Sequence, residues 1–340
     1  MAAEHETFSL GDFTFADGNT LPDARIAYAT YGELNQARDN AVVLPTWFVG
    51  THADHEWMIG DGDGFVLDTS RYFVVVPSLF ANGLSSSPSN TPPPFDRRRF
   101  PRPSIEDNVR AHHRLVSEHL EITGVELVIG GSMGAFQTFQ WGLSHPDLVR
   151  RIMPTGGAST CSPHCRVFLE GVKAALLADP DYGDGEYEGP PERGLRAVGR
   201  VYAGWGLSQA FYRQALYRRM GFETLDSFLV DFWEAFFVDL DANDLLSQLD
   251  TWQRAELAKT AGYDGDLARA LGDIRARAIL APGENDLYFP PEDMAREAEQ
   301  MPNAELAVIP GPWGHFSDSG VDEECNEFVR ETAHRLLARD

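Results

Sequence analysis

The junction between an apolar run, "VELVIGG" (125–131), and a helix-like segment, "MGAFQTFQWGLS" (133–144), constrains the fold more than any other feature of this sequence. One small polar residue, Ser132, separates the two, and Gly130 and Gly134 lie two positions away on either side. Glycine tolerates a sharp turn because it has no Cβ to clash. A Gly-x-Ser-x-Gly pattern between a strand and a helix is typical of an exposed nucleophilic serine. The alternative interpretation is a tight turn with no chemical role.

Short apolar runs alternate with helix-like segments through the first half of the chain and return near its end. Such alternation predicts a mostly parallel sheet with helices on both faces. From about 158 to 273 no β-rich run occurs, and the segments there have helical spacing. We therefore predict an α/β core over 1–157, an inserted helical cap over 158–272, and completion of the core over 273–340. The predicted strands are 42–44, 74–76, 125–131, 149–157, 278–281 and 306–309, and a helix is predicted over 105–120.

A serine hydroxyl is a poor nucleophile at neutral pH, so it needs a base and an acid that orients the base. In the α/β-hydrolase fold the acid and then the histidine follow the serine along the chain, each after a later strand. Asp286 follows the predicted strand at 278–281, and His315 follows the one at 306–309. Glu284 is the alternative acid. The predicted catalytic set is the serine of the turn with Asp286 and His315.

The tetrahedral intermediate of acyl transfer needs hydrogen-bond donors for its oxyanion. The backbone N–H of Met133, directly after the serine, is one predicted donor. The second comes from the loop "VVLPTWFVGTH", where we predict the N–H of Phe48, with Trp47 as the alternative. His52 and His55 are in or near this loop, but no carboxylate pattern accompanies them. We interpret them as polar residues lining the mouth of the site and predict no metal.

The formal net charge of −24 argues against nucleic acid and anionic membranes as partners, because both require a basic surface. No apolar run reaches the ~20 residues that span a bilayer, and the N-terminal "MAAEHETFSLGDF" has no secretory signal pattern. Cys161, Cys165 and Cys325 form no paired disulfide framework and fit a reducing compartment. These observations predict a cytoplasmic protein.

Several segments, in order over nearly the whole chain, resemble the homoserine O-acetyltransferase family of the α/β-hydrolase superfamily. They are "ARIAYATYGELN", "AVVLPTWFVGTHA", "VLDTSRYFVVVPSLFANGLSSSPSN", "GGSMGAFQTFQWGLSHPDLVRRI", "DANDLLSQLDTW" and "NDLYFPPED". The resemblance implies an α/β-hydrolase fold with a cap and acyl-enzyme chemistry on Ser132. It also places Asp286 on the catalytic acid of that family.

Two departures from the family pattern bear on the substrate. Leu207, in "RVYAGWGLS", falls where the family carries an arginine for the homoserine carboxylate, and Phe316 replaces the aspartate that helps to bind the substrate amine. A zwitterionic amino acid would lose both partners, and a buried charge without a partner costs several kcal/mol. We therefore expect a neutral ester, with Trp47, Leu207 and Phe316 among the residues that contact it.

Three functions remain open at this point. The first is a serine hydrolase that cleaves a small or medium acyl ester through an acyl-enzyme. The second is an O-acyltransferase that uses acetyl-CoA or another acyl-CoA as co-substrate, with homoserine or another alcohol as acceptor. The third is a catalytically silent binding protein, against which the intact Ser132, Asp286 and His315 argue. None of the three requires a bound cofactor.

The segment 225–237 carries large apolar residues at three- and four-residue spacings, which predicts a helix with a wide apolar face. The residues are Leu225, Phe228, Leu229, Phe232, Trp233, Phe236 and Phe237. A cap has little core to cover, and surplus aromatic surface marks an interface. Members of the resembling family pair through cap helices, so we predict a two-fold homodimer with an acyl tunnel between cap and core. The alternative is that this helix only packs on the core.

Overall fold

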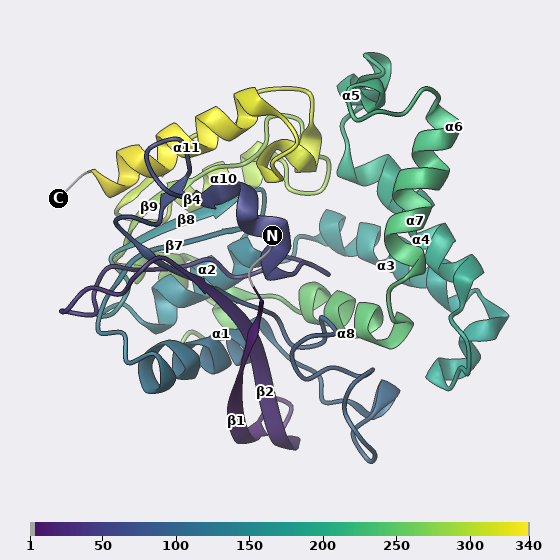
Figure 1. The fold of residues 1–340 in the computed structure, drawn as a ribbon, viewed down its shortest axis with the longest axis horizontal. Helices are drawn as coiled ribbons and strands as arrows, with labels where there is room; N and C mark the ends of the chain where they lie inside the picture. The colour runs from purple at the N-terminus through teal and green to yellow at the C-terminus, as the bar shows by residue number, and fades with distance from the viewer. Residues whose placement is uncertain (1–3, 339–340) are drawn as a thin grey trace.

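A twisted eight-stranded sheet forms the centre of the computed structural model, which describes residues 4–338 (Figure 1). Its strand order is β1-β2-β6-β3-β7-β8-β9-β10. Neighbouring strands from β6 to β10 are parallel, whereas β2 runs antiparallel to both β1 and β6. The strands are β1 (Glu6–Thr14), β2 (Thr20–Tyr31), β3 (Ala41–Val43), β6 (Phe73–Pro77), β7 (Val125–Gly131), β8 (Arg151–Thr155), β9 (Arg277–Leu280) and β10 (Ala304–Leu306). A separate two-stranded sheet pairs β4 (Ile59–Gly60) with β5 (Leu67–Asp68).

Helices cover both faces of this sheet because its central strands are apolar on both sides. In β7, Leu127 and Ile129 enter one apolar cluster and Val128 enters the other. The helix α11 packs on the first face, and α1 and α10 pack on the second. The core helices are α1 (Ile105–Arg114), α2 (Met133–Ser144), α9 (Leu267–Gly272), α10 (Pro291–Ala298) and α11 (Glu323–Leu337). This arrangement confirms the predicted α/β-hydrolase architecture.

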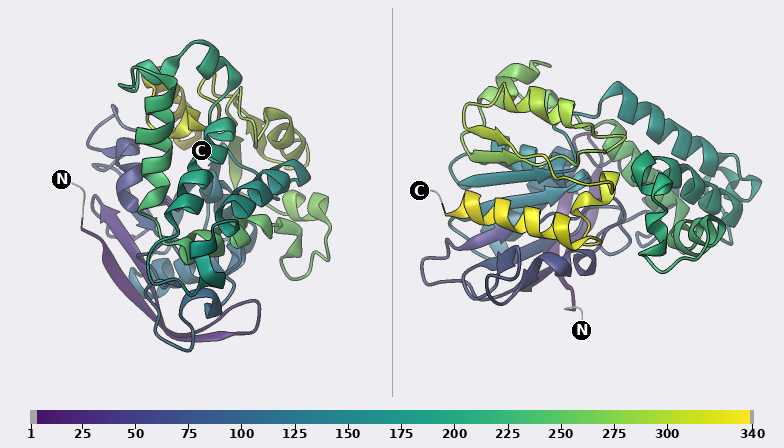
Figure 2. Two further views of the ribbon diagram at one scale, coloured as in Figure 1. Left: turned by 90° about the vertical axis from the view of Figure 1, so that its right-hand side faces the viewer. Right: turned by 90° about the horizontal axis from the view of Figure 1, so that it is seen from above.

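A group of helices inserted between β8 and β9 forms a cap, gathered at one end of the molecule in Figures 1 and 2. They are α3 (Pro163–Leu177), α4 (Glu192–Gly206), α5 (Gln209–Arg213), α6 (Leu225–Phe228), α7 (Ala235–Val238) and α8 (Ala242–Gln253). A π-helical turn over Leu229–Glu234 joins α6 to α7. Within the described residues no strand lies between β8 and β9, as the sequence predicts.

The end of the helical insertion differs from the predicted boundary at 272. Leu257, Ala270 and Leu271 are buried in the apolar cluster that also contains Phe139 of α2 and Ile274. The chain from Leu257 onward therefore packs on the sheet core rather than on the cap. Spacing alone could not reveal this, because a helix has the same periodicity wherever its apolar face is buried.

The N-terminal hairpin β1–β2 was not among the predicted strands. Its strands lie at the edge of the sheet, where many side chains are exposed, so they lack the apolar runs of the central strands. The last predicted strand, 306–309, is also shifted: β10 spans Ala304–Leu306, and Ile309 forms an isolated bridge with Gly283. Among the described residues, no helix has the length and apolarity needed to cross a membrane.

The basic run at Arg97–Arg99 contacts the cap. Arg97 and Arg99 form ion pairs with Glu186 at 2.9 and 2.6 Å. Arg98 donates a hydrogen bond to the carbonyl of Asp184 at 2.8 Å. These three arginines thus bind the acidic loop that follows α3.

Candidate active site

The turn between β7 and α2 holds Ser132 in a strained conformation. Its φ and ψ are +54° and −120°, a region that residues with a Cβ rarely adopt. Neither flanking glycine could carry a side chain: a Cβ on Gly130 would lie 2.7 Å from the Gly134 carbonyl oxygen, and one on Gly134 would lie 2.6 Å from that of Pro45. Backbone carbonyl groups therefore approach Gly130 and Gly134 so closely that only glycine fits at these two positions of the Gly-x-Ser-x-Gly pattern.

His315 and Asp286 form a hydrogen-bonded pair. The Nδ1 atom of His315 lies 2.8 Å from Oδ2 of Asp286, whose side chain has no exposed surface. The other carboxylate oxygen of Asp286 accepts the backbone N–H groups of Tyr288 and Phe289, both at 3.0 Å. With Nδ1–H donating to the carboxylate, Nε2 of the imidazole is left as the basic nitrogen.

The alternative acid, Glu284, has a different partner. Its carboxylate accepts the backbone N–H of Gly311 at 3.1 Å and does not contact His315. The geometry therefore favours Asp286 as the residue that orients the histidine.

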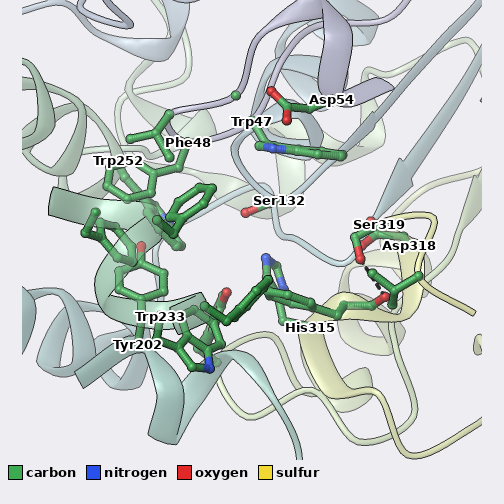
Figure 3. Close-up of a pocket in the computed structure, with 18 residues that line it drawn as sticks. Trp47, Phe48, Asp54, Ser132, Tyr202, Trp233, Trp252, His315, Asp318 and Ser319 are labelled. Atoms are coloured by element: carbon green, nitrogen blue, oxygen red, sulfur yellow. Dashed lines mark hydrogen bonds between the residues drawn. The ribbon is translucent and has the colours of Figure 1, made fainter. Parts of the chain in front are cut away.

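Ser132 and His315 both line a pocket of about 320 Å³ between the cap and the core. Figure 3 shows the Ser132 hydroxyl and a ring nitrogen of His315 pointing into the same space. Ser132 is only 7% exposed, so reagents reach it through this pocket. The structure thus brings together the serine, histidine and aspartate singled out in the sequence.

Of the predicted oxyanion donors, Phe48 and its alternative Trp47 line this pocket, and Met133 directly follows the lining residue Ser132. Met133 is the first residue of α2, and the first N–H groups of a helix have no partner within it. In the facing loop, Val49 donates its N–H to Oε1 of Gln248 at 2.7 Å, so this group is already bonded. Within residues 4–338 the backbone N–H groups of Trp47 and Phe48 have no acceptor, and both residues line the pocket. Neither N–H is therefore committed to a protein acceptor in the described residues.

Aromatic side chains make up most of the pocket wall. They are Trp47, Phe48, Tyr202, Phe232, Trp233, Phe236, Phe237, Trp252, Tyr288 and Phe316. Burial raises the pKa values of the Tyr202 and Tyr288 phenols well above their usual range, so both remain neutral. Among the described lining residues the acidic ones are Asp54 and Asp318, and none is lysine or arginine. The pocket is therefore apolar, with any fixed charge in it negative.

The structure separates the three predicted substrate contacts. Trp47 and Phe316 line the pocket, and the Phe316 ring lies 5.5 Å from that of Trp233. Leu207 does not line it and has no exposed surface. This residue is the C-cap that follows α4, and its backbone packs against Gly314, where a Cβ would lie 3.2 Å from the Leu207 carbonyl carbon. The expectation that Leu207 contacts the substrate is therefore wrong for this pocket.

His52 and His55 do not line the mouth of the pocket as the sequence suggested. Both are buried, and the His55 ring packs 4.0 Å from that of Trp47. Burial lowers the pKa of His55 to about 3, so it is neutral. Within residues 4–338 no group of three or more His, Cys, Asp or Glu side chains is placed to hold a metal ion.

Sequence reasoning did not find several residues of the pocket, chiefly Tyr202, Trp252, Tyr288 and Asp318. Tyr202 lies on α4 and Trp252 on α8, so whether they face the site depends on how the cap helices pack. A signal existed for Tyr288, which lies two residues after the predicted acid Asp286. Asp318 carried a similar signal, three residues after His315.

Residues 55–317 match the family model described as the alpha/beta hydrolase fold, and the chain belongs to that family. Within it, the chain is similar to a probable esterase of Corynebacterium glutamicum, with 37% identity over 323 residues that cover 94% of this chain and 91% of that protein. It is 34% identical over 335 residues to ethyl acetate hydrolase of Pseudomonas veronii, covering 98% and 95% of the two chains.

The chain is also similar to a homoserine O-acetyltransferase of Trichormus variabilis, with 29% identity over 318 residues that cover 89% and 86% of the two chains. Among solved structures, an acetylester hydrolase from Corynebacterium glutamicum superimposes with a TM-score of 0.95 at 35% identity, covering 99% of this chain and 96% of that one. The predicted resemblance to the homoserine O-acetyltransferase family is thus confirmed. The two esterases are more similar to this chain than that transferase is.

Proposed function

We propose that this protein is a serine esterase that hydrolyses neutral esters with a small or medium acyl group. The observation that carries the proposal is the chemical character of the pocket at Ser132, which is aromatic and has no cationic group among its described lining residues. The similarity to an ethyl acetate hydrolase and a probable esterase supports the same conclusion.

In the proposed mechanism, Nε2 of His315 accepts the Ser132 proton while the serine oxygen attacks the ester carbonyl carbon. Asp286 holds the imidazole in place and stabilises the imidazolium that forms. The oxyanion accepts hydrogen bonds from the N–H groups of Met133 and Phe48. When the tetrahedral intermediate collapses, the bond to the alcohol oxygen breaks and His315 gives its proton to the departing alcohol.

Water completes the proposed cycle. It attacks the acyl-serine carbonyl carbon, and His315 accepts a proton from it. Collapse of the second intermediate breaks the bond to the serine oxygen, which recovers the proton from His315. The products are a carboxylic acid and the free enzyme.

A CoA-dependent acyltransferase is the second candidate, favoured by the 29% identity to a homoserine O-acetyltransferase. Two observations argue against it. A CoA thioester carries phosphate groups, which proteins bind with lysine, arginine or exposed N–H groups, and the described pocket lining offers neither lysine nor arginine. Phe316 also lines the pocket, and by the resemblance to the transferase family it replaces an aspartate that would bind the amine of an amino-acid acceptor.

Intact-mass measurement tests the choice between the two. The wild-type protein and Ser132→Ala are mixed with p-nitrophenyl acetate or with acetyl-CoA, quenched in acid and weighed. We expect one acetyl group on the wild type with the ester, none on the variant, and negligible labelling with acetyl-CoA. Efficient labelling by acetyl-CoA, followed by transfer to an added alcohol, would overturn the esterase proposal.

We also propose that the protein forms a homodimer through the cap. Part of the apolar face predicted over 225–237 is used internally, because Phe228, Trp233 and Phe237 are buried. Leu229 and Phe232 are partly buried against the core, whereas Leu225 is 42% exposed and Phe236 is 48% exposed. Exposed large apolar side chains on one helical segment are suited to a contact with a second copy.

A further inference from the structure

A second carboxyl group lies at the active site, on the segment that carries His315. Asp318 ends the 3-10 turn Gly314–Asp318, lines the pocket and is only 7% exposed. In a 3-10 turn, side chains three positions apart lie on the same side. The turn therefore presents Asp318 on the same side as His315, close enough for the charge of His315 to lower the pKa of the Asp318 carboxyl, and Figure 3 shows both residues on this short segment.

Asp318 is tied to the nucleophile turn through Thr155, the last residue of β8. The Thr155 hydroxyl donates to Oδ2 of Asp318 at 2.6 Å, and the Thr155 carbonyl accepts the N–H of Ser132 at 3.1 Å. A Cβ on Gly131 would lie 2.5 Å from the same carboxylate oxygen. The carboxyl thus packs directly against the residue that precedes the nucleophile.

Two carboxyl groups, those of Asp286 and Asp318, interact with a positive charge on His315. The pKa of Asp318 is raised overall, chiefly by burial, although the charge of His315 and the Thr155 hydrogen bond act to lower it. The titratable neighbours are Asp286, Tyr288 and Cys325. Burial raises the pKa of Tyr288 well above its usual range and that of Cys325 to about 12, so both are neutral at neutral pH.

We propose that Asp318 is a positioning residue of the esterase. It anchors the His315 turn to the end of β8, and it places a second negative charge beside the imidazolium that forms when His315 takes the Ser132 proton. The proposal rests on the proposed function, because it assigns Asp318 a role in activating the same serine. Asp286 orients the imidazole through a direct hydrogen bond, whereas Asp318 acts electrostatically from the same turn that carries His315.

The variant Asp318→Asn separates charge from shape, because an asparagine oxygen can still accept the Thr155 hydrogen bond. We expect kcat/KM for p-nitrophenyl acetate to fall about tenfold at neutral pH. A nearby negative charge favours protonated histidine, so its removal moves the acid limb of the pH profile to lower pH, by about half a unit to one unit. Thermal unfolding of each variant verifies that it is folded.

Asp322→Asn is the matched control. Asp322 lies four residues further on and is also 7% exposed. It caps α11 by accepting the Cys325 N–H at 3.3 Å, pairs with Arg219 at 2.8 Å and does not line the pocket. We expect this variant to keep the wild-type pH profile even if it loses stability.

The rate at which a fluorophosphonate inactivates the protein gives a second readout, because it reports activation of Ser132 without requiring the correct ester. Asp318→Asn should slow inactivation and shift its pH dependence in the same direction. An unchanged pH profile in both assays would overturn the role of Asp318. A wild type that is rapidly inactivated but hydrolyses no ester would instead refute the proposed function, and the inactivation data would still test Asp318.

Discussion

Replacing Ser132 with glycine should stabilise the protein while abolishing its activity. The serine has φ +54° and ψ −120°, and such a conformation costs about 1–3 kcal/mol in a residue with a Cβ. Glycine adopts this conformation without strain, but it loses more backbone entropy on folding, and this loss offsets about 0.5–1 kcal/mol of the relieved strain. The net expectation is that Ser132→Gly is more stable than Ser132→Ala by about 0.5–2 kcal/mol.

Ser132→Ala is the proper reference, because it also lacks the hydroxyl but keeps the Cβ and therefore the strain. For 340 residues, an unfolding entropy of about 2.1 cal/mol/K per residue makes 1 kcal/mol correspond to roughly 1.4 °C. The midpoint of thermal unfolding should thus be about 1–3 °C higher for the glycine variant, with a parallel shift in urea unfolding. Equal or lower stability of Ser132→Gly would show that the turn stores no strain at this residue.

Three other predictions concern the chemistry, the substrate and the assembly. His315→Ala should reduce kcat by several orders of magnitude, as should Ser132→Ala, and Asp286→Asn somewhat less, measured with p-nitrophenyl acetate; a variant of Ser132 that keeps more than a few per cent of activity contradicts the mechanism. An ester of a dicarboxylic acid with a free carboxylate should have a kcat/KM at least about a hundredfold below that of p-nitrophenyl acetate, because the pocket gives an anion no partner. Added L-homoserine should not accelerate turnover of p-nitrophenyl acetate. Comparable rates for the two esters, or rapid acetyl transfer to homoserine, would count against a site for neutral esters. Light scattering after size exclusion should report a dimer at micromolar concentration that Leu225→Asp splits without loss of esterase activity, whereas a monomeric wild type disproves the dimer.

The sequence was informative where local backbone geometry and chemistry coincide. Ser132 could be identified because it lies between a strand and a helix in a tight turn. The strand, the turn and the helix are each recognisable in the sequence, as an apolar run, two glycines and helical spacing. Asp286 and His315 could be placed because residues that follow parallel strands gather at one edge of a sheet. The hydrogen bond between them is observed in the structure at 2.8 Å.

The walls of the pocket depended on packing that a single sequence does not encode locally. Trp233 and Phe236 belong to the same apolar stripe, yet one is buried and the other is exposed. Periodicity identifies the face of a helix but not what covers each part of it. Leu207 shows a similar limit of the sequence. The resemblance predicted that it contacts the substrate, but it follows the end of α4 and its backbone packs against Gly314, next to His315.

The hydrogen bond from Val49 to Gln248 links the cap to the chemistry. Gln248 lies on α8 of the cap, and it also donates to the carbonyl of Ala81 at 2.9 Å. One cap side chain therefore holds the loop whose N–H groups are the proposed oxyanion donors. A displacement of α8 would therefore shift this loop, and with it the N–H groups of Trp47 and Phe48 that are proposed to bind the oxyanion.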